Sequence, residues 1–599
     1  MFLIQSLCYI CLYEHKVETQ CYRTKKHFMN RTFQLKLLSI ATVLLLSLTG
    51  FANSKINKVK VVFTTDVHGA IFAYDFIEQK PKESSLSQVY AYIKSLKAAK
   101  ENYLLLDNGD MLQGQPTVYY YNFVDTLSKH LQARVMNYMG YSALTVGNHD
   151  LEPGHPVYDR VRAESNFPWL AANAVKPSGK PYFEPYKVFK VAGKKIVVLG
   201  LITPAIPSWL PENIWSGMTF EDMVESEKKW INIIQTKEKP DAIIGLFHTG
   251  INFNYNNQNE ETYKNENAAA IVAKRIKGFD AILFGHDHEV YNSKIVNSYG
   301  DTVQMLNPAA FARNVGVLSI NFSGSKKILS GEIVDVKSVK PDPDFMATFN
   351  SDFNKIKDYS SKEIGVLDKT INAEDAYFGS SSFVDLVHRA ALKESKADIS
   401  MASPLMFNAL IPAGTITVGD MFRLYKYENL LYGLKMSGQE INDFLEYSYN
   451  LWIKKVDDPN NGMLLLNSST HFKNPYYNFD SGAGLIYTVD ITKDAGSRIN
   501  IISLANGQPF ELTNTYTVAM SSYRGNGGGG HLTFGAKIPQ EEISKRIVYV
   551  SKFDLRYLIM NEIIRTGKLN HTPLNSWKFI PEDMRQKAES VDRKIIFNK

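Results

Sequence analysis

Short apolar runs separated by amphipathic segments fill the first half of the chain. The amphipathic segment 85–100 places Leu86, Val89, Ile93 and Leu96 on one helical face and predicts a helix behind a Ser85 cap. The apolar runs are short enough to be buried strands of an α/β domain. They cover residues 59–63, 103–106, 143–146, 195–201, 242–247 and 281–284.

This alternation stops near residue 340, where Lys340-Pro341-Asp342-Pro343 interrupts the pattern. Residues 345–359 then predict a polar helix that connects two domains. In the second half we expect helices at 382–393 and after the Ser437-Gly438 turn, and strands at 430–436, 485–491 and 516–521. The expected organisation is a first domain over 53–340, a linker helix over 341–364 and a second domain over 365–599.

The N-terminal residues predict export. Residues 29–52 combine a basic start, an apolar run at 37–48 and small residues near Ala52, which is typical of a cleaved signal peptide. A retained membrane anchor is the alternative, but the apolar run is short for a bilayer span. Residues 1–28 fit no signal and are expected to precede the true start at Met29. We therefore expect a periplasmic or secreted protein, cleaved near Ala52, with no stable membrane span.

The leader also dominates the charge and the cysteine content. The whole chain carries 67 basic and 61 acidic residues, whereas without residues 1–52 the counts are 61 and 59. The nearly neutral remainder does not favour a nucleic-acid polymer as partner. Cys8, Cys11 and Cys21 all lie in the leader, so no disulfide or thiol nucleophile is expected in the mature chain. We expect a monomer.

Polar clusters follow the predicted strands. Five of the eleven histidines after residue 52 lie in these clusters, so a chance scatter of buried histidines explains them poorly. Ligands of open α/β sheets gather beyond the carboxyl ends of strands. The mixture of carboxylate, amide and imidazole groups suits a pair of divalent transition metals. The clusters are Asp66-Val67-His68, Asp110, Asn148-His149-Asp150, His248 and Gly285-His286-Asp287-His288.

These motifs resemble those of the calcineurin-like metallophosphoesterases, most strongly over 64–69, 107–114, 147–152 and 285–288. The two-domain layout resembles the bacterial periplasmic nucleotidases, which include 5'-nucleotidase/UDP-sugar hydrolases and 2',3'-cyclic-nucleotide 2'-phosphodiesterase/3'-nucleotidases. The resemblance implies an α/β fold: a sandwich of two mixed sheets flanked by helices, followed by a smaller α+β domain that recognises the nucleotide.

The resemblance also implies a ligand set for two divalent ions, which Mn, Zn, Fe or Co could supply. Asp110 would bridge the ions, and the other ligands would divide between them. The first set is Asp66, His68 and His288, and the second is Asn148, His248 and His286. The 5'-nucleotidase branch often has Gln where His288 stands. The two ions would bind phosphate oxygens and activate a water.

His149 adjoins a ligand without being one, and we expect it to stabilise the transition state or protonate the leaving group. The 5'-nucleotidase branch has an Asp three residues later that orients this His; here Glu152 takes that place. In the second domain the family holds the base between two rings. Tyr427 and Tyr523 match those places, with His531 as an alternative to Tyr523. Stacking tolerates any base, so broad base specificity is expected.

The sequence indicates the family more clearly than it indicates the branch within the family. The 5'-nucleotidases typically carry a Gly-rich stretch ending in a substrate-binding Arg, whereas residues 401–406 here have neither. We therefore expect a 2',3'-cyclic-nucleotide 2'-phosphodiesterase/3'-nucleotidase. The alternatives are a 5'-nucleotidase/UDP-sugar hydrolase, a sugar-phosphate phosphatase, and a non-catalytic nucleotide-binding surface protein.

Overall fold

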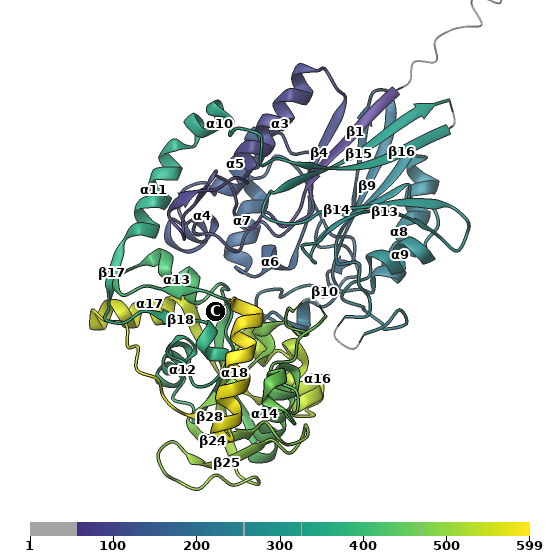
Figure 1. The fold of residues 1–599 in the computed structure, drawn as a ribbon. Coiled ribbons are helices and arrows are strands. Elements are labelled where there is room, and N and C mark those ends of the chain that lie inside the picture. The colour runs from purple at the N-terminus through teal and green to yellow at the C-terminus, as the bar shows by residue number, and fades with distance from the viewer. Residues whose placement is uncertain (1–56, 256–257, 325, 469, 599) are drawn as a thin grey trace, which may run out of the picture. The chain divides into compact units, whose positions relative to one another are not determined.

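The computed structural model describes residues 57–255, 258–324, 326–468 and 470–598 (Figure 1). The expected signal at 29–52, the preceding residues and all three cysteines lie outside these ranges. Residues 58–320 and 328–599 form one compact unit, and Asn57 and 321–327 fall outside it. Every site residue discussed below belongs to that unit. Within the described ranges, no helix has both the length and the apolar character that a membrane crossing requires.

The first domain contains two mixed six-stranded sheets. In the first sheet β1 pairs in parallel with β4, β4 with β5 and β5 with β6. The strand order is β16 (Lys326–Asp335), β15 (Asn314–Ser323), β1 (Asn57–Thr64), β4 (Tyr103–Asp107), β5 (Ala143–Thr145) and β6 (Trp169–Leu170). Predicted strands at 59–63, 103–106 and 143–146 are confirmed as β1, β4 and β5.

The second sheet contains the other three predicted strands, as β9, β11 and β12. Its four central strands are parallel, and the two edge strands, β13 and β8, run antiparallel to their neighbours. The order is β13 (Val290–Val296), β14 (Thr302–Pro308), β12 (Ala281–Phe284), β11 (Ala242–His248), β9 (Lys194–Ile202) and β8 (Tyr186–Val191).

The two sheets pack against each other through small residues. The Thr145 hydroxyl in β5 donates to the Leu246 carbonyl in β11 at 2.8 Å. A Cβ on Gly200 of β9 would lie 2.4 Å from the Leu170 side chain, so only glycine permits this approach. Helices α3 (Leu86–Ala98) and α5 (Leu131–Met139) contribute to the core of the first sheet, and α8 (Met223–Glu238) and α9 (Ala269–Arg275) to that of the second (Figure 1). The predicted sandwich is confirmed.

Two local predictions need correction. Ser85 occupies the position before α3, but its hydroxyl bonds to Gln88 Oε1 at 2.9 Å and caps no helical N–H group. The predicted helix at 345–359 is two helices, α10 (Pro343–Thr348) and α11 (Asn350–Ser361), because buried Phe349 adopts φ −104° between them. The domain boundaries themselves stay predictions.

The second half forms a smaller α+β arrangement with a five-stranded and a three-stranded sheet, and its predicted helices and strands are confirmed. The larger sheet has the order β23 (Ser481–Ala483), β19 (Ile399–Ala402), β26 (Thr515–Ser521), β22 (Leu430–Ser437) and β27 (Ile547–Asp554). The smaller has β25 (Ile499–Leu504), β24 (Leu485–Asp490) and β28 (Trp577–Ile580). The main helices are α12 (Ser382–Ser395), α13 (Val418–Leu424), α14 (Gly438–Trp452), α17 (Leu555–Thr566) and α18 (Glu582–Phe597).

Candidate metal centre and substrate site

The end of β11 and the segments that follow β1, β4, β5 and β12 bring all seven predicted ligands together. Asp66, His68, Asp110 and His288 form one group of side chains whose ligand atoms lie within 4.8 Å of one another. Asp110, His248 and His286 form a second group by the same measure. Asp110 belongs to both groups, which is the arrangement expected of a carboxylate between two ions.

In the first group the imidazole rings of His68 and His288 approach each other in a T-shaped arrangement. His68 Nε2 lies 3.1 Å from His288 Nε2, and His288 Nε2 lies 3.2 Å from Asp66 Oδ1. Asp110 Oδ2 is 4.0 Å from His68 Nε2. Asp66, His68 and Asp110 are buried, whereas His288 is partly exposed. One side of this group is therefore accessible to a ligand.

The second group adds the amide that the sequence singled out. His248 Nε2 lies 3.2 Å from Asp110 Oδ2. Asn148 Oδ1 lies 3.1 Å from His248 Nε2 and 3.0 Å from His286 Nδ1. Asn148 is the first residue of α6 (Asn148–Leu151), so the turn after β5 delivers its side chain to the cluster.

The donor set fits divalent metals. His68 Nδ1 lies 3.1 Å from the Gln113 carbonyl and His248 Nδ1 lies 2.7 Å from the Asn108 carbonyl, which leaves each Nε2 lone pair facing the cluster. The backbone is strained at the same place, since five ligand residues adopt positive φ, a conformation that non-glycine residues rarely take. These are Asp66, His68, Asp110, His286 and His288, with φ of 49°, 48°, 61°, 78° and 58°.

The electrostatics keep the carboxylates ionised. Burial would raise the pKa of Asp66 and of Asp110, but nearby imidazoles outweigh burial and lower both pKa values. For Asp110 the principal imidazole is His248. Burial and the neighbouring His288 lower the pKa of His68 to about 3, so His68 is neutral and can donate its lone pair. Burial would lower the pKa of His248, but Asp110 outweighs burial and raises it to about 10, so His248 would have to lose a proton when an ion binds. Ionised carboxylates and neutral imidazoles are the forms that bind metals.

Two glycines make room for the ligands. A Cβ on Gly147 would lie 2.2 Å from Asp110 Oδ1, and a Cβ on Gly285 would lie 2.5 Å from Asp66 Oδ2. Both distances are far below van der Waals contact, so a side chain at either position would displace a ligand carboxylate. Sterics therefore explain why glycine stands at the start of the Gly147-Asn148-His149-Asp150 and Gly285-His286-Asp287-His288 motifs.

Asp150 and Glu266 contribute to the site without having been predicted to. The fully buried Asp150 carboxylate accepts the backbone N–H groups of Gly147, Asp110 and Met111 at 2.8, 2.9 and 2.8 Å, which ties the loop after β4 to the start of α6. Glu266 Oε1 lies 3.3 Å from His286 Nε2. Asp150 lies in the Asn148-His149-Asp150 cluster, so the sequence could have identified it as a site residue. Glu266 lies outside every motif and gave no sequence signal.

His149 and Glu152 form the expected pair. Glu152 Oε2 hydrogen-bonds to His149 Nδ1, and the backbone N–H group of His149 donates to Asp110 Oδ1 at 2.8 Å. Burial would lower the pKa of His149, but Asp110 and Glu152 outweigh burial and raise it to about 9. The longer Glu side chain therefore reaches the imidazole from the i+3 position, and the imidazole is placed to donate a proton.

The predicted aromatic residues have different surroundings. The Tyr427 ring stacks on the His149 ring with centroids 6.3 Å apart and planes 13° apart. Tyr523 is half-buried, and a Cβ on Gly528 would lie 2.6 Å from its ring. Burial raises the pKa of Tyr427, and Tyr477, Tyr476 and Tyr523 raise it further. Tyr477 was not predicted.

Two nearby side chains have structural roles. His531 is completely buried, with its ring nitrogens 3.2 and 3.0 Å from the carbonyl oxygens of Gly529 and Asn478, so it is a core residue and no ring platform. Arg524 is also buried and pairs with Asp480 at 2.7 Å. It holds the loop that carries Tyr523.

Comparison with known proteins agrees with this geometry. Residues 59–290 match the model of the calcineurin-like phosphoesterases, and residues 363–536 match that of the 5'-nucleotidase C-terminal domain. The chain belongs to the calcineurin-like phosphoesterases of the two-domain nucleotidase type. It is a hydrolase of phosphoric ester bonds.

Several relatives share most of the chain. It is 25% identical to the 2',3'-cyclic-nucleotide 2'-phosphodiesterase/3'-nucleotidase of Haemophilus influenzae, with 92% of each protein covered. It is 28% identical to the trifunctional nucleotide phosphoesterase YfkN of Bacillus subtilis over 87% of this chain, but spans only 39% of that longer protein. A putative 5'-nucleotidase structure from Staphylococcus aureus shares the fold, with TM-score 0.73, 21% identity and coverage of 87% of this chain and 99% of that one.

Proposed function

We propose that the chain hydrolyses nucleotide phosphate esters at a two-metal centre, as a 2',3'-cyclic-nucleotide 2'-phosphodiesterase/3'-nucleotidase. The observation that carries this proposal is the stack of Tyr427 on His149, whose backbone N–H group donates to Asp110 in the candidate metal cluster. A base stacked near Tyr427 would hold its ribose phosphate close to the metal ligands. The alternative is a 5'-nucleotidase/UDP-sugar hydrolase.

The proposed roles follow from the contacts. Asp66, His68 and His288 would hold one ion, and Asn148, His248 and His286 the other, with Asp110 shared. When bound, such ions neutralise the charge of a phosphate ester and activate water. His149 would donate a proton to the leaving oxygen, and Glu152 would orient the imidazole. Tyr427 and Tyr523 would bind the base.

The preference for cyclic and 3' substrates rests on two supports. Residues 401–406 offer no Arg to a 5'-phosphate, and the buried Met401 belongs to β19. The Haemophilus relative, which this chain covers almost fully, carries the cyclic-phosphodiesterase name. We further propose export to the periplasm or the medium after cleavage near Ala52, a monomeric state, and domains at 53–340 and 365–599 joined by 341–364.

Initial rates on four substrates test the proposal. They are 2',3'-cyclic AMP, 3'-AMP, 5'-AMP and UDP-glucose, compared with Mn or Zn restored after chelation. We expect the cyclic and 3' substrates to give the highest kcat/KM. A higher kcat/KM for 5'-AMP or UDP-glucose would favour the alternative, and no nucleotide turnover beside hydrolysis of an aryl phosphate would refute a nucleotidase role.

A further inference from the structure

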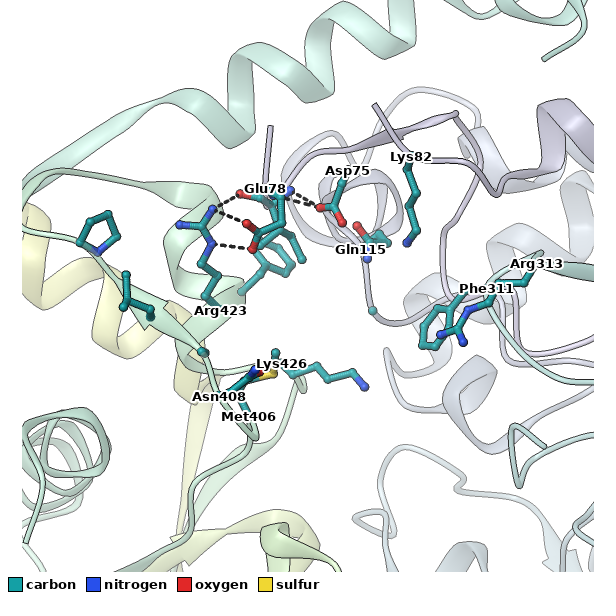
Figure 2. A pocket seen from close by; sticks show the side chains of 16 residues that line it. Asp75, Glu78, Lys82, Gln115, Phe311, Arg313, Met406, Asn408, Arg423 and Lys426 are labelled. Atoms are coloured by element: carbon teal, nitrogen blue, oxygen red, sulfur yellow. Dashed lines mark hydrogen bonds and ion pairs between the residues drawn. The ribbon is translucent and has the colours of Figure 1, made fainter. Parts of the chain in front are cut away.

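A cavity of about 560 Å³ lies beside the metal cluster and has a basic lining (Figure 2). Lys82, Arg313 and Lys426 line it, together with Phe311 and apolar residues that include Phe422. Lys82 follows β3 (Lys80–Pro81), Arg313 precedes β15 and Lys426 follows α13. Three segments far apart in sequence thus bring one kind of charge to one place.

The cations gather around a single ring. Lys82 Nζ, the Arg313 guanidinium carbon and Lys426 Nζ lie 5.6, 5.1 and 5.9 Å from the centroid of Phe311. Figure 2 shows the two lysine side chains extending into the space beside this ring. The Phe311 ring also lies 5.4 Å from the His68 ring and 5.7 Å from that of His288. One aromatic ring therefore connects the cations and the first metal group.

Among the described residues, three of the cavity's cationic side chains have no direct acidic partner, although Asp75 lies close enough to Lys82 to raise its pKa. In the described part of the chain, none of these three side chains forms a hydrogen bond or an ion pair. The cavity's acids have other partners. Glu78 pairs with Arg423 at 2.9 Å, and Asp75 accepts the N–H groups of Ile77 and Glu78 at 3.0 Å each.

Holding these cations together has a cost. Burial lowers the pKa of Lys82 and of Lys426 more than the nearby Asp75 and Glu428 raise them, and Arg313 lowers the pKa of Lys82 further. The turn that presents Phe311 is strained as well, with φ of 62° at Phe311 and 50° at Ala312. A bound anion would offset the mutual repulsion of the cations.

The position of Lys426 indicates what such an anion belongs to. Its Nζ lies 5.5 Å from the Tyr427 ring and 5.9 Å from that of Phe311. A nucleotide with its base near Tyr427 and one phosphate at the metal ligands would turn a third substituent of its ribose toward this cavity. A phosphate dianion suits the convergence of one guanidinium and two ammonium groups.

We propose that Lys82, Arg313 and Lys426 form an anion subsite for the second phosphate of a nucleoside 3',5'-bisphosphate, whose 3'-phosphate lies at the metal cluster. This inference rests on the proposed function, because it assumes that nucleotides bind there. Under this proposal the protein binds the 5'-phosphate of the bisphosphate directly and so prefers the bisphosphate to the 3'-monophosphate. The same cations could instead bind released inorganic phosphate, which has the same chemistry.

Competition experiments on the metal-loaded full chain test the subsite. The inhibition constants (Ki) of adenosine 3',5'-bisphosphate, 3'-AMP, 5'-AMP and inorganic phosphate are measured against p-nitrophenyl phosphate hydrolysis. We expect the bisphosphate Ki to be about tenfold lower than that of 3'-AMP, the gain of one charge-assisted contact. Arg313→Gln and Lys426→Gln should each reduce this ratio to below about threefold.

Conservative variants and a matched control variant show whether the charge of these side chains or their packing determines the ratio of the two Ki values. Arg313→Lys and Lys426→Arg keep the charge and should keep most of the ratio. Lys357→Gln removes an exposed lysine that also lies over a tyrosine, Tyr74 at 5.6 Å, but that does not line the cavity, and it should leave the ratio unchanged.

Each other outcome overturns the subsite. Equal Ki values for 3'-AMP and the bisphosphate would do so while leaving the proposed function intact. A rise in the Ki of inorganic phosphate in the Gln variants, as large as that of the bisphosphate, would assign the cations to the released product. Failure of every nucleotide to compete, beside normal hydrolysis of the aryl phosphate, would refute the proposed function and the subsite together.

Discussion

His149 is the residue at which the metal cluster, the acid Glu152 and the Tyr427 ring meet. If it donates a proton to the leaving group, His149→Ala should lower kcat on 3'-AMP about 10²–10⁴-fold, the usual contribution of a general acid. Glu152→Gln should give a smaller loss, because the imidazole remains. Steady-state kinetics, together with elemental analysis of bound metal, measures both effects.

His155 supplies a matched control for this experiment. Its Nδ1 lies 2.9 Å from Asp159 Oδ2 in α7 (His155–Glu164), so it makes a similar acid contact but contacts no predicted ligand. His155→Ala should leave kcat little changed, because the half-buried His155 side chain bonds to Tyr158, Asp159 and Ser216 and to no residue proposed to bind metal or substrate. Full activity in His149→Ala with both metals bound would rule out the acid role.

A substitution at Gly147 would disturb the ligand cluster through a steric clash alone. An alanine Cβ there would meet Asp110 Oδ1 at 2.2 Å, so the carboxylate must move away from its place between the two groups. We expect Gly147→Ala to lose at least about tenfold in metal affinity, as displaced ligand geometry does. Metal titration followed by elemental analysis measures this. Gly379→Ala is the control, because nothing lies within 4 Å of its added Cβ, and unchanged affinity in Gly147→Ala would contradict the steric argument.

Helix α8 contains a buried carboxyl group that destabilises the packing of the helix against the second sheet. Glu227 is fully buried on the face that α8 turns to the second sheet, and neither carboxylate oxygen has a partner within the described residues. Burial raises its pKa well above 4.5. The folded state therefore keeps a proton that the unfolded state releases above about that pH, and stability falls as the pH rises.

Glu227→Met should remove this effect. We expect it to raise the free energy of unfolding by about 1–3 kcal/mol at neutral pH, the cost of an unsatisfied buried polar group. The gain over the wild type should be larger at pH 8 than at pH 5, as read from urea unfolding midpoints. The exposed neighbour Glu225 is the control, since Glu225→Met should change little. A gain that is independent of pH would show that Glu227 does not titrate in this range.

Strands were predictable from the sequence where a continuous apolar run marked them. The six apolar runs are buried strands because both faces of each sheet are covered. Edge strands such as β13 and β16 were missed because they are mostly exposed and carry no such run. The seven ligands were predictable because each follows or ends a strand. Glu266, Phe311 and Tyr477 were not, because only tertiary packing brings these residues to the site.

At the scale of the whole molecule, the two sheets and the second domain meet at the cluster. Asp66, Asp110 and Asn148 come from the first sheet, and His248 and His286 from the second. Gln113 adds a link to the second domain. Its carbonyl lies near His68 Nδ1, and its Nε2 donates to the Lys426 carbonyl at 3.2 Å. The candidate metal cluster therefore joins elements that are far apart in sequence.

Metal removal should then weaken the whole first domain. Ions that bind only the folded chain stabilise it by about 2.7–4.1 kcal/mol when their concentration is 100–1,000 times Kd. We expect a chelator to lower Tm and added Mn or Zn to restore it, as followed by calorimetry. Asp110→Asn should show a much smaller chelator shift, because Asp110 belongs to both groups. An equal shift in this variant would mean that the stabilising ions bind elsewhere, since the loss of the shared carboxylate cannot leave both sites intact.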